Sequence, residues 1–546
     1  MKTTRRTLLQ TLAAAPALFG ATPKSRVCDV ALIGGGFGGC AAALGALRNG
    51  MRVVMTEETD WIGGQVTSQA VPPDEHPWIE SFGATRAYRE YRTGVRDYYR
   101  NHYPLTAEAR ARPFLNPGDG SVSKLTHEPR VSLAVLEGML APYVSGGWLT
   151  VLLRHVPIAA DIERDRIRSV QIKSLETGAE SVIDAQYFLD ATEQGDLLPL
   201  AHVEFVTGFE SSKQTGEPHA PAEAQPANIQ SFTYCFAIDY RKGEDHTIDK
   251  PEDYTFWRDY IPAMKPAWPG KLLSWSMPNP RTLAERKVAF DPEIEDPVKG
   301  SLNLWLYRRI ANAKNFTPGA FKSDITLVNW PQNDYWLGNL HGVSKQEEAK
   351  HLLGGKQLSL SFLYWMQTEA GYKGLRLRRD ITGTEDGLAK YPYIRESRRI
   401  EAEFTVLEQH VGTEARKPQT AAEIFPDTVG IGSYRIDLHP TSGDDNYIDI
   451  SSLPFQIPLG SLIPKRVDNL LAASKNLGVT HITNGCYRLH PVEWNIGESA
   501  GMLAAEAIAT HESPRGIRNQ PQRLEAFQSR LTSRGVELAW PHLTPR

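Results

Sequence analysis

The sequence predicts an α/β fold, and the order of elements near its N-terminus is the main reason. An almost entirely apolar segment, Val27–Ile33, is expected to form a buried strand that leads into a glycine-rich turn. The apolar stretch Cys40–Leu47 then has the character of a helix, and Arg52–Met55 is expected to form a second strand that leads to Glu57. Strand, glycine turn, helix, strand and acid in this order are typical of a dinucleotide-binding βαβ unit.

The glycines of this turn have separate roles in such a unit. Gly34 permits the tight turn, Gly36 lets the backbone approach a pyrophosphate, and Gly39 lets the helix pack closely on the strand. The N-terminus of the helix offers free N–H groups and a partial positive charge to the phosphates. Glu57 follows at roughly the 20-residue spacing of the acid that accepts hydrogen bonds from ribose hydroxyls. An ordinary glycine-rich turn is the alternative, but it would not require the rest of this pattern.

Composition limits the classes of function. With 546 residues, of which 41% are hydrophobic, the chain can bury a large core and is expected to form two or more domains. A net charge of −4 provides no basic field for nucleic acid. The four cysteines are scattered without a CxxC pair, which argues against a zinc site, an iron–sulfur cluster or a covalently attached haem. We therefore expect no metal and no nucleic-acid partner, and a packing role for Cys28 and Cys40.

The N-terminal segment has the features of a twin-arginine export signal. Arg5 and Arg6 precede a short, weakly apolar run, Thr11–Phe19, and small residues suited to cleavage lie close by. The run is too short to span a bilayer, and no later stretch approaches the ~18 apolar residues that a membrane helix needs. We expect residues 1–24 to be a signal peptide and the mature protein to be periplasmic or secreted, without a membrane span. A frayed basic tail is the alternative.

Residues 25–210 are expected to form the first part of the nucleotide-binding domain. Arg and Tyr residues recur at helical spacing within Trp78–Tyr103, which indicates a solvated amphipathic helix. A turn region is expected over Asp161–Arg168, before a strand near Val170. The apolar stretch Tyr187–Asp190 is then expected to be a buried strand that ends in a polar turn.

Residues 211–455 are expected to form a second, substrate-facing domain. They begin with a stretch rich in Pro, Ala, Glu and Gln, Ser211–Gln230, which is typical of a surface loop or linker. Most of the tryptophans follow, and we favour a large aromatic core over stacking on a sugar. Residues 456–546 return to the first domain through a strand near Val467–Ala473 and a helix over Val492–Thr510.

Three separated segments together carry a resemblance to a known family. They are Gly34–Gly39 with Glu57 and Gly63-Gly64; Asp190-Ala191-Thr192 with Gly195-Asp196; and Asn469–Ala473 with Thr480-His481, Arg488 and Gly497–Gly501. Further likeness lies in Tyr393–Arg399 and Gly432–His439, within a coverage of about residues 26–509. On these residues the chain resembles FAD-dependent oxidoreductases of the glutathione-reductase-type FAD fold, and more closely a bacterial family of single-chain flavoproteins that are often exported. The resemblance implies a Rossmann-like FAD-binding domain assembled from N-terminal, middle and C-terminal segments, with an inserted substrate domain.

The resemblance also implies FAD as the cofactor and a set of contacts to it. These are Gly34, Gly36, Gly39, Glu57, Gly64, Gln65, Asp190, Gly497 and Gly501. Two departures leave the tuning of the flavin open: Glu193 stands where glycine is common, and Glu498-Ser499 stand where Gln-Ala is more frequent. A helix that begins near Pro491 would aim its N-terminus at the pyrimidine edge of the flavin, and Arg488 would stabilise negative charge on the reduced ring. An ordinary packing helix rich in Gly and Ala is the alternative.

Several polar residues of the same segments are candidates for the chemistry. The candidates for a general base are His481, His490 and His439. The candidates for binding an anionic or polyhydroxyl substrate are Arg395, Arg398, Arg399 and Asp437. His481 is favoured as the base because it stands between the returning strand and the C-terminal helix. The three arginines could instead be the solvated face of a helix, and Asp437 could instead orient His439 or belong to an ordinary turn.

These assignments favour an enzyme in which FAD carries the electrons and the protein positions a substrate and supplies a base. Gly430-Ile431-Gly432 is not followed by an apolar helix, so we expect no dedicated NAD(P) domain. The preferred hypothesis is two-electron oxidation of a C–OH or C–N bond in a small organic substrate, including a polyhydroxylated one. The electrons would pass to oxygen or to a separate exported carrier. An NAD(P)H-dependent flavin hydroxylase and a non-catalytic electron-transfer flavoprotein are the alternatives.

Overall fold

A mostly parallel β-sheet assembled from distant parts of the chain dominates the computed structural model, which describes residues 24–294 and 302–541. Its strands are β1 (Lys24–Ile33), β2 (Val53–Glu57), β3 (Leu149–Leu153), β4 (His155–Glu163), β5 (Arg166–Ser174), β6 (Glu180–Asp190) and β21 (Leu470–Ala472). They lie in the order β3-β2-β1-β6-β5-β4, and β21 pairs with the last residues of β6. β4 and β5 are antiparallel additions, whereas the others run parallel. The carboxyl ends of β1, β2, β6 and β21 therefore meet at one edge, where such sheets bind ligands.

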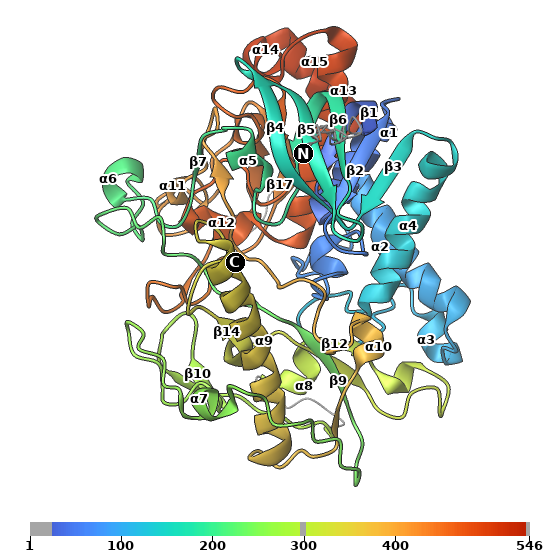
Figure 1. Cartoon of the computed structure of the whole chain (residues 1–546), viewed down its shortest axis with the longest axis vertical. Coiled ribbons are helices and arrows are strands. Elements are labelled where there is room, and N and C mark those ends of the chain that lie inside the picture. Colours follow the sequence, from blue (N-terminus) through green and yellow to red (C-terminus); the bar gives the residue numbers. More distant parts are fainter. Residues whose placement is uncertain (1–23, 295–301, 542–546) are drawn as a thin grey trace, which may run out of the picture.

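The first and last parts of the chain are joined by two helices that pack in close contact. The helix α1 (Phe37–Leu47) is fully buried and lies beside α13 (His490–Thr510), so that the blue and red segments meet in the upper part of Figure 1. A Cβ atom at Gly497 would stand 2.0 Å from the carbonyl oxygen of Gly38, and one at Gly501 would stand 2.1 Å from that of Ala42. Only glycine allows this approach, and the C-terminal segment thereby completes the N-terminal unit. Cys28 and Cys40 are buried and unpaired, as a packing role predicts.

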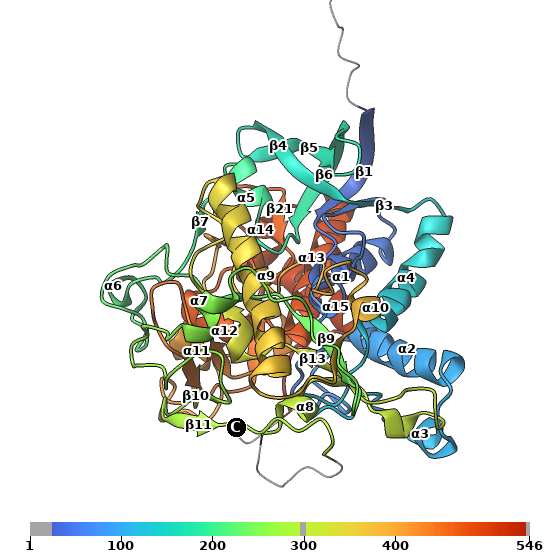
Figure 2. The ribbon, with the colours of Figure 1, turned by 60° about the horizontal axis from the view of Figure 1, so that its bottom comes forward.

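A second hydrophobic core lies within residues 211–455. Its sheet has the order β12 (Arg309–Ala311), β13 (Ile325–Val328), β9 (Phe236–Tyr240) and β15 (Leu375–Leu377), and the long helix α9 (Lys345–Thr368) lies nearby in Figures 1 and 2. Five tryptophans are at most 4% exposed and belong to this core: Trp257, Trp268, Trp305, Trp330 and Trp336. The prediction that the tryptophans form a core is confirmed.

The remaining elements are shorter or flank the two cores. The helices are α2 (Arg86–His102), α3 (Ala107–Ala111), α4 (Pro129–Ser145), α5 (Leu197–Leu200), α6 (Ser212–Thr215), α7 (Tyr254–Asp259), α8 (Leu304–Tyr307), α10 (Arg379–Thr382), α11 (Glu408–Val411), α12 (His481–Tyr487), α14 (Pro514–Asn519) and α15 (Pro521–Ser533). The strands are β7 (Phe205–Val206), β8 (Phe232–Thr233), β10 (Ser276–Pro278), β11 (Glu285–Lys287), β14 (Asp334–Tyr335), β16 (Arg399–Ile400), β17 (Thr428–Gly432), β18 (Ile436–Leu438), β19 (Ile448–Ile450) and β20 (Phe455–Pro458). Among the helices that the structure describes, none combines the length and the hydropathy that a bilayer crossing demands.

The amphipathic helix expected within Trp78–Tyr103 is present as α2, which starts at Arg86 and has one buried and one exposed face. Its tyrosines Tyr88, Tyr91 and Tyr99 are buried, and Arg92 is only 3% exposed. The guanidinium of Arg92 forms ion pairs with Glu75 at 2.8 Å and with Glu80 at 2.7 Å. Because these carboxylates lie outside the helix, the charge pattern of the helix alone could not reveal that Arg92 is buried.

Two other expectations in the chain are refined. The turn expected over Asp161–Arg168 lies at residues 164–165, between β4, which continues to Glu163, and β5, which starts at Arg166. The expected surface linker Ser211–Gln230 contains the short helix α6 and ends in buried residues, including Gln230. Gln230 enters a buried hydrogen-bond network, so this segment contributes to the interior of the protein.

Candidate functional site

A cavity of about 570 Å³ opens at the carboxyl ends of β1, β2 and β6. Its lining includes Gly34, Gly36, Glu57 and Gly64, together with residues 191–194 of the turn after β6. The chain therefore brings its first glycine turn, the acid at the end of β2 and the polar turn after β6 to one place. The N-terminus of α1 lies beside them, with its positive dipole end toward this edge of the sheet.

The three glycines of the first turn have geometries that match their predicted roles. Gly34 has φ +103°, and a Cβ atom there would stand 2.3 Å from the carbonyl carbon of Ala191. A Cβ atom at Gly39 would stand 2.4 Å from the carbonyl oxygen of Gly34, so this glycine sets the distance between helix and strand. A Cβ atom at Gly36 would instead approach the side chain of Glu193 in the cavity. The first and third glycines shape the protein, and the second leaves room for a ligand.

Glu57 forms part of the cavity wall and is held there by backbone donors. Its carboxylate accepts hydrogen bonds from the N–H of Gly35 at 3.2 Å and of Thr59 at 2.8 Å. Burial raises the pKa of Glu57 to about 7, against the lowering effect of these hydrogen bonds. Ribose hydroxyls would supply donors to a carboxylate that has lost its water, which is the role expected of this acid.

Five predicted cofactor residues do not line this cavity: Gly39, Gln65, Asp190, Gly497 and Gly501. Asp190 accepts hydrogen bonds from the N–H groups of Thr192 at 3.0 Å and Leu197 at 3.2 Å, and so fixes the turn after β6. The side chain of Gln65 donates to the carbonyl oxygen of Arg488 at 3.1 Å. Gly497 and Gly501 pack against α1. Contact of these residues with FAD stays a prediction.

A family model described as FAD dependent oxidoreductase matches residues 29–531. The chain belongs to this family. It is therefore an enzyme with FAD as cofactor, and the non-catalytic electron-transfer alternative is set aside. The glycine turn, the carboxylate of Glu57 and the N-terminus of α1 fit the cofactor, because they offer room for phosphates, a hydroxyl acceptor and a positive dipole.

Solved structures of flavoenzymes are similar to the enzyme at low identity. OxyS anhydrotetracycline hydroxylase from Streptomyces rimosus is 10% identical, with a TM-score of 0.34 over 93% of this chain and 66% of that one. The p-nitrophenol 4-monooxygenase PnpA from Pseudomonas putida is 10% identical, with a TM-score of 0.35 over 94% and 88%. The myxobacterial chondrochloren halogenase CndH is 17% identical, with a TM-score of 0.23 over 41% and 45%. No curated protein matches the sequence.

A second polar site, here called the His439 cluster, consists of Asp334, Arg395, Asp437, His439 and Arg488. Its centre is a pair in which the Nδ1 atom of His439 lies 2.6 Å from the Oδ2 atom of Asp334. Arg395 donates to the other oxygen of Asp334 at 2.8 Å. Burial alone would raise the pKa of Asp334, but Arg395 and His439 outweigh it and hold that pKa below its usual value. Asp334 thus holds the Nδ1 side of the His439 ring and fixes its orientation.

The His439 cluster is tied to the cofactor cavity through Arg488. The Nη2 atom of Arg488 donates to the carbonyl oxygen of Asp437 at 2.9 Å, and its Nη1 atom donates to the hydroxyl of Tyr393 at 3.2 Å. Its own carbonyl oxygen accepts the hydrogen bond from Gln65, which directly follows the cavity residue Gly64. The helix α13 begins two residues after Arg488, at His490. The cluster thus stands beside the N-terminus of α13, on the side of the second core.

The three candidate histidines lie in different surroundings. His490 is fully buried, and its Nδ1 atom accepts the backbone N–H of Asp74 at 3.0 Å; burial lowers its pKa well below the usual value. His481 is also fully buried, with its ring stacked on Phe209 at a centroid distance of 3.6 Å. The side chain of His439 is 18% exposed. Of the three, only His439 has a partly exposed side chain, which a base needs in order to contact a substrate. The sequence had favoured His481.

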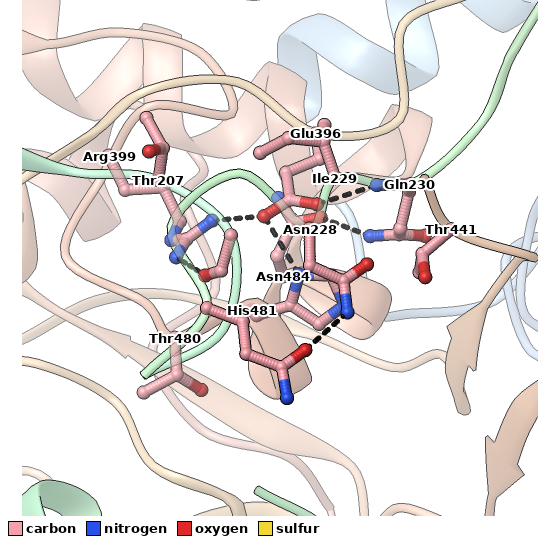
Figure 3. A network of polar contacts seen from close by, with 12 residues as sticks. Thr207, Asn228, Ile229, Gln230, Glu396, Arg399, Thr441, Thr480, His481 and Asn484 are labelled. Atoms are coloured by element: carbon pink, nitrogen blue, oxygen red, sulfur yellow. Dashed lines mark hydrogen bonds and ion pairs between the residues drawn. The ribbon is translucent and has the colours of Figure 1, made fainter. Parts of the chain in front are cut away.

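The network around His481 is shown in Figure 3. Glu396 is its centre: the carboxylate lies 2.9 Å from the Nδ1 atom of His481 and accepts hydrogen bonds from Arg399 at 2.5 Å and from the backbone N–H of Gln230 at 3.0 Å. The side chain of Gln230 donates to that of Asn484 at 3.2 Å. These contacts join α12, β16 and the end of the expected linker into one buried unit.

The predicted substrate arginines also have partners within the protein. Arg395 is 2% exposed and bound to Asp334, and Arg399 is fully buried. Arg398 pairs with Asp196, a cavity residue, at 3.1 Å. The alternative of a solvated helix face is wrong, because this segment is extended and its charges are compensated inside the protein. Contact of Arg395 or Arg398 with a substrate stays a prediction.

Three residues of these sites were not identified from sequence. Asp334 lies in the tryptophan-rich region without a motif around it, and Lys475 follows a short strand that gives no sign of a buried charge. Glu493 accepts a hydrogen bond from the N–H of Gly38 at 3.1 Å, a contact between residues far apart in the chain. The only available signal was Glu493 in the first turn of a helix, where an acid complements the dipole.

Replacing Glu396 with glutamine should destabilise the protein in a pH-dependent way. Burial would raise the pKa of Glu396, but His481 and Arg399 outweigh it and hold the value at about 2, below the usual 4.5. Its ionised form thus stabilises the fold above about pH 4.5, and this contribution disappears as the pH falls through about 2. We expect Glu396→Gln to lower the free energy of unfolding by about 3–5 kcal/mol at neutral pH. The difference from wild type should shrink toward pH 2 in denaturation experiments.

The matched control is Glu414→Gln, which removes the carboxylate of an exposed ion pair with Lys417. Such a pair contributes at most about 1 kcal/mol. Equal losses in the two variants would show that the Glu396 network does not stabilise the fold.

Proposed function

We propose that the enzyme oxidises a C–OH or C–N bond of a small organic substrate with His439 as general base, and passes the electrons to oxygen or to an exported carrier. The observation that supports this most is the pair of His439 and Asp334 at 2.6 Å, beside a helix N-terminus that belongs to the FAD-binding half. A carboxylate that fixes one imidazole nitrogen prepares the other to accept a proton.

FAD, when bound, supplies the two-electron oxidant. The residues of the chain account for the proton. The Nε2 atom of His439 accepts the proton of the substrate O–H or N–H group, while the adjacent C–H bond gives up its hydrogen with the electron pair. The imidazolium that forms is stabilised by Asp334 at Nδ1 and by Asp437, whose Oδ2 atom lies 3.7 Å from Nε2.

The charges around His439 support a polar substrate. Asp437 is ionised, because His439 and Arg435 outweigh its burial and hold its pKa far below the usual range. It can therefore accept a hydrogen bond from a substrate hydroxyl, while Arg488 beside it can donate one. Arg395 is turned to Asp334, and we assign it to holding that carboxylate in place.

The reaction class is tested by mixing the FAD-loaded enzyme anaerobically with alcohols, hydroxy acids, polyols and amines. The proposal requires that one of these classes bleaches the flavin without any pyridine nucleotide. Reoxidation with release of hydrogen peroxide would identify oxygen as the acceptor, and its absence would favour a carrier. Rapid bleaching by NADPH alone, with none by the organic compounds, would instead establish the flavin hydroxylase and overturn the proposal.

We also propose that the enzyme is exported through the twin-arginine pathway; the signal at residues 1–24 lies outside the described residues apart from Lys24. The support is the arginine pair before a weakly apolar run. Replacing Arg5 and Arg6 with lysine should leave folded, FAD-containing precursor in the cytoplasm. Cell fractionation measures this, and unchanged export of the double variant would contradict the proposal.

A further inference from the structure

A buried lysine lies at the edge of the sheet where the cofactor cavity opens. Lys475 follows β21, and the loop around it is fixed to the end of β6: the N–H of Ala473 and the side chain of Asn476 both donate to the carbonyl oxygen of Asp190, at 3.0 and 3.1 Å. The side chain of Lys475 is 1% exposed. Burial of an ammonium group costs free energy unless the group is paired with an opposite charge. The partner of Lys475 therefore indicates which kind of group the site binds.

The partner of Lys475 is Glu193, which lines the cavity. The other carboxylate oxygen of Glu193, Oε1, is buried and makes no hydrogen bond with any residue that the structure describes. A Cβ atom at Gly36 would stand 2.8 Å from this oxygen, and one at Gly64 would stand 2.4 Å from it. The carboxylate therefore lies between the two glycine segments of the cofactor site.

FAD and the carboxylate of Glu193 cannot share this position. The glycine segments are those that must approach the cofactor backbone, and the diphosphate of FAD is itself negatively charged. Repulsion and overlap would drive Glu193 away when FAD binds. Lys475 would then face the cofactor without its partner, within a largely water-excluded setting where a charge acts strongly.

Two further features keep Lys475 charged and directed at this place. Burial would lower its pKa, but Glu193 and Glu493 outweigh it and raise that pKa above its usual value. Glu493 stays bound to the N–H of Gly38 at 3.1 Å and to Ser474 at 2.9 Å, at the meeting point of α1 and α13. Glu493 can thus preserve the ammonium form after Glu193 has moved.

We propose that Lys475 is a cofactor-binding residue that pairs with FAD in place of Glu193 and stabilises the added negative charge of the reduced cofactor. Glu193 is then the competitor that FAD displaces. The assignment does not depend on which substrate is oxidised. From the sequence, Arg488 was expected to stabilise negative charge on the reduced flavin, and we assign that role to Lys475 instead. The guanidinium of Arg488 already has Asp437 and Tyr393 as partners.

The test uses the mature enzyme, stripped of FAD and reloaded, in four forms: wild type, Lys475→Met, Glu193→Gln and the double variant. Affinity for FAD is measured by fluorescence quenching, and the reduction potential is measured by dye-coupled titration. We expect Lys475→Met to bind oxidised FAD at least tenfold more weakly. It should bind reduced FAD weaker still by a further factor of about ten, which is a potential lower by ~30 mV for a two-electron couple. Glu193→Gln should bind FAD more tightly than wild type, because the competing charge is gone.

The double variant is the control for misfolding, because it leaves no unpaired carboxylate at this position. Its potential should remain as low as that of Lys475→Met, and a thermal melt close to wild type would show that the loss is specific. Wild-type affinity and potential in the double variant would overturn the proposal. Weakened FAD binding in Glu193→Gln, matching that of Lys475→Met, would also overturn it, because the pair would then be a structural ion pair.

Discussion

We expect His439→Gln to slow the anaerobic reduction of FAD by substrate by roughly 10²–10⁴-fold, the usual contribution of a general base. Glutamine fills similar space and can still bond to Asp334, but it cannot accept the substrate proton. FAD should remain bound, because His439 does not line the cofactor cavity. Stopped-flow absorbance of the flavin measures the rate once a substrate class has been found.

A second variant separates a base from a packing residue. Asp334→Asn should keep the histidine but slow the reaction, because the histidine loses its fixed orientation. His102→Gln, at an exposed position at the end of α2, is the matched control and should behave as wild type. Undiminished flavin reduction in His439→Gln would remove it from the mechanism.

Gly36→Val should give a folded protein that binds no FAD. Gly36 has φ −59°, which any residue adopts, and the nearest atom to an added Cβ is the end of the Glu193 side chain. The protein can therefore accept the valine, but the cavity cannot then accept a diphosphate against this turn. The flavin absorbance of the purified variant, relative to protein, measures the result.

Two other glycines serve as comparisons for Gly36→Val. Gly34→Val should fail to fold, because a Cβ atom there overlaps the backbone of Ala191 and the φ of +103° disfavours it. Gly138→Ala should leave FAD bound, because a Cβ atom at that position in α4 meets no other atom within 4 Å. Normal flavin content in Gly36→Val would place the cofactor elsewhere.

The local pattern of the first 60 residues was sufficient to predict the βαβ unit, since strand, turn and helix there depend on neighbouring residues. The close packing of Gly497 against α1 was also within reach, because small residues recur along the predicted helix. The burial of Arg92 and Arg96 in α2 was not, because glutamates from another segment neutralise them. The turn over Asp161–Arg168 was predicted too widely, because most of its polar residues belong to the strand pair of β4 and β5.

In the site, too, features that depend on neighbouring residues could be predicted, and features that depend on distant residues could not. The family resemblance was sufficient to predict FAD as the cofactor and Glu57 as one of its contacts. In the structure, Glu57 lies in the cavity wall. It could not rank the histidines, because the rank depends on burial and on partners such as Asp334, 105 residues away along the chain from His439. Lys475 was missed for the same reason. Its role depends on its pairing with Glu193 and on the packing of α1 against α13, and the residues around it in the sequence indicate neither.

The most direct test of the account is a crystal structure of the enzyme with FAD and a slow substrate analogue. We predict FAD along the glycine turn, with Glu193 displaced from between Gly36 and Gly64. The reacting carbon of the analogue should lie about 3–3.5 Å from the flavin ring. Its hydroxyl or amine should lie within about 3.2 Å of the Nε2 atom of His439. A flavin ring too far from His439 for one small molecule to touch both would contradict the account.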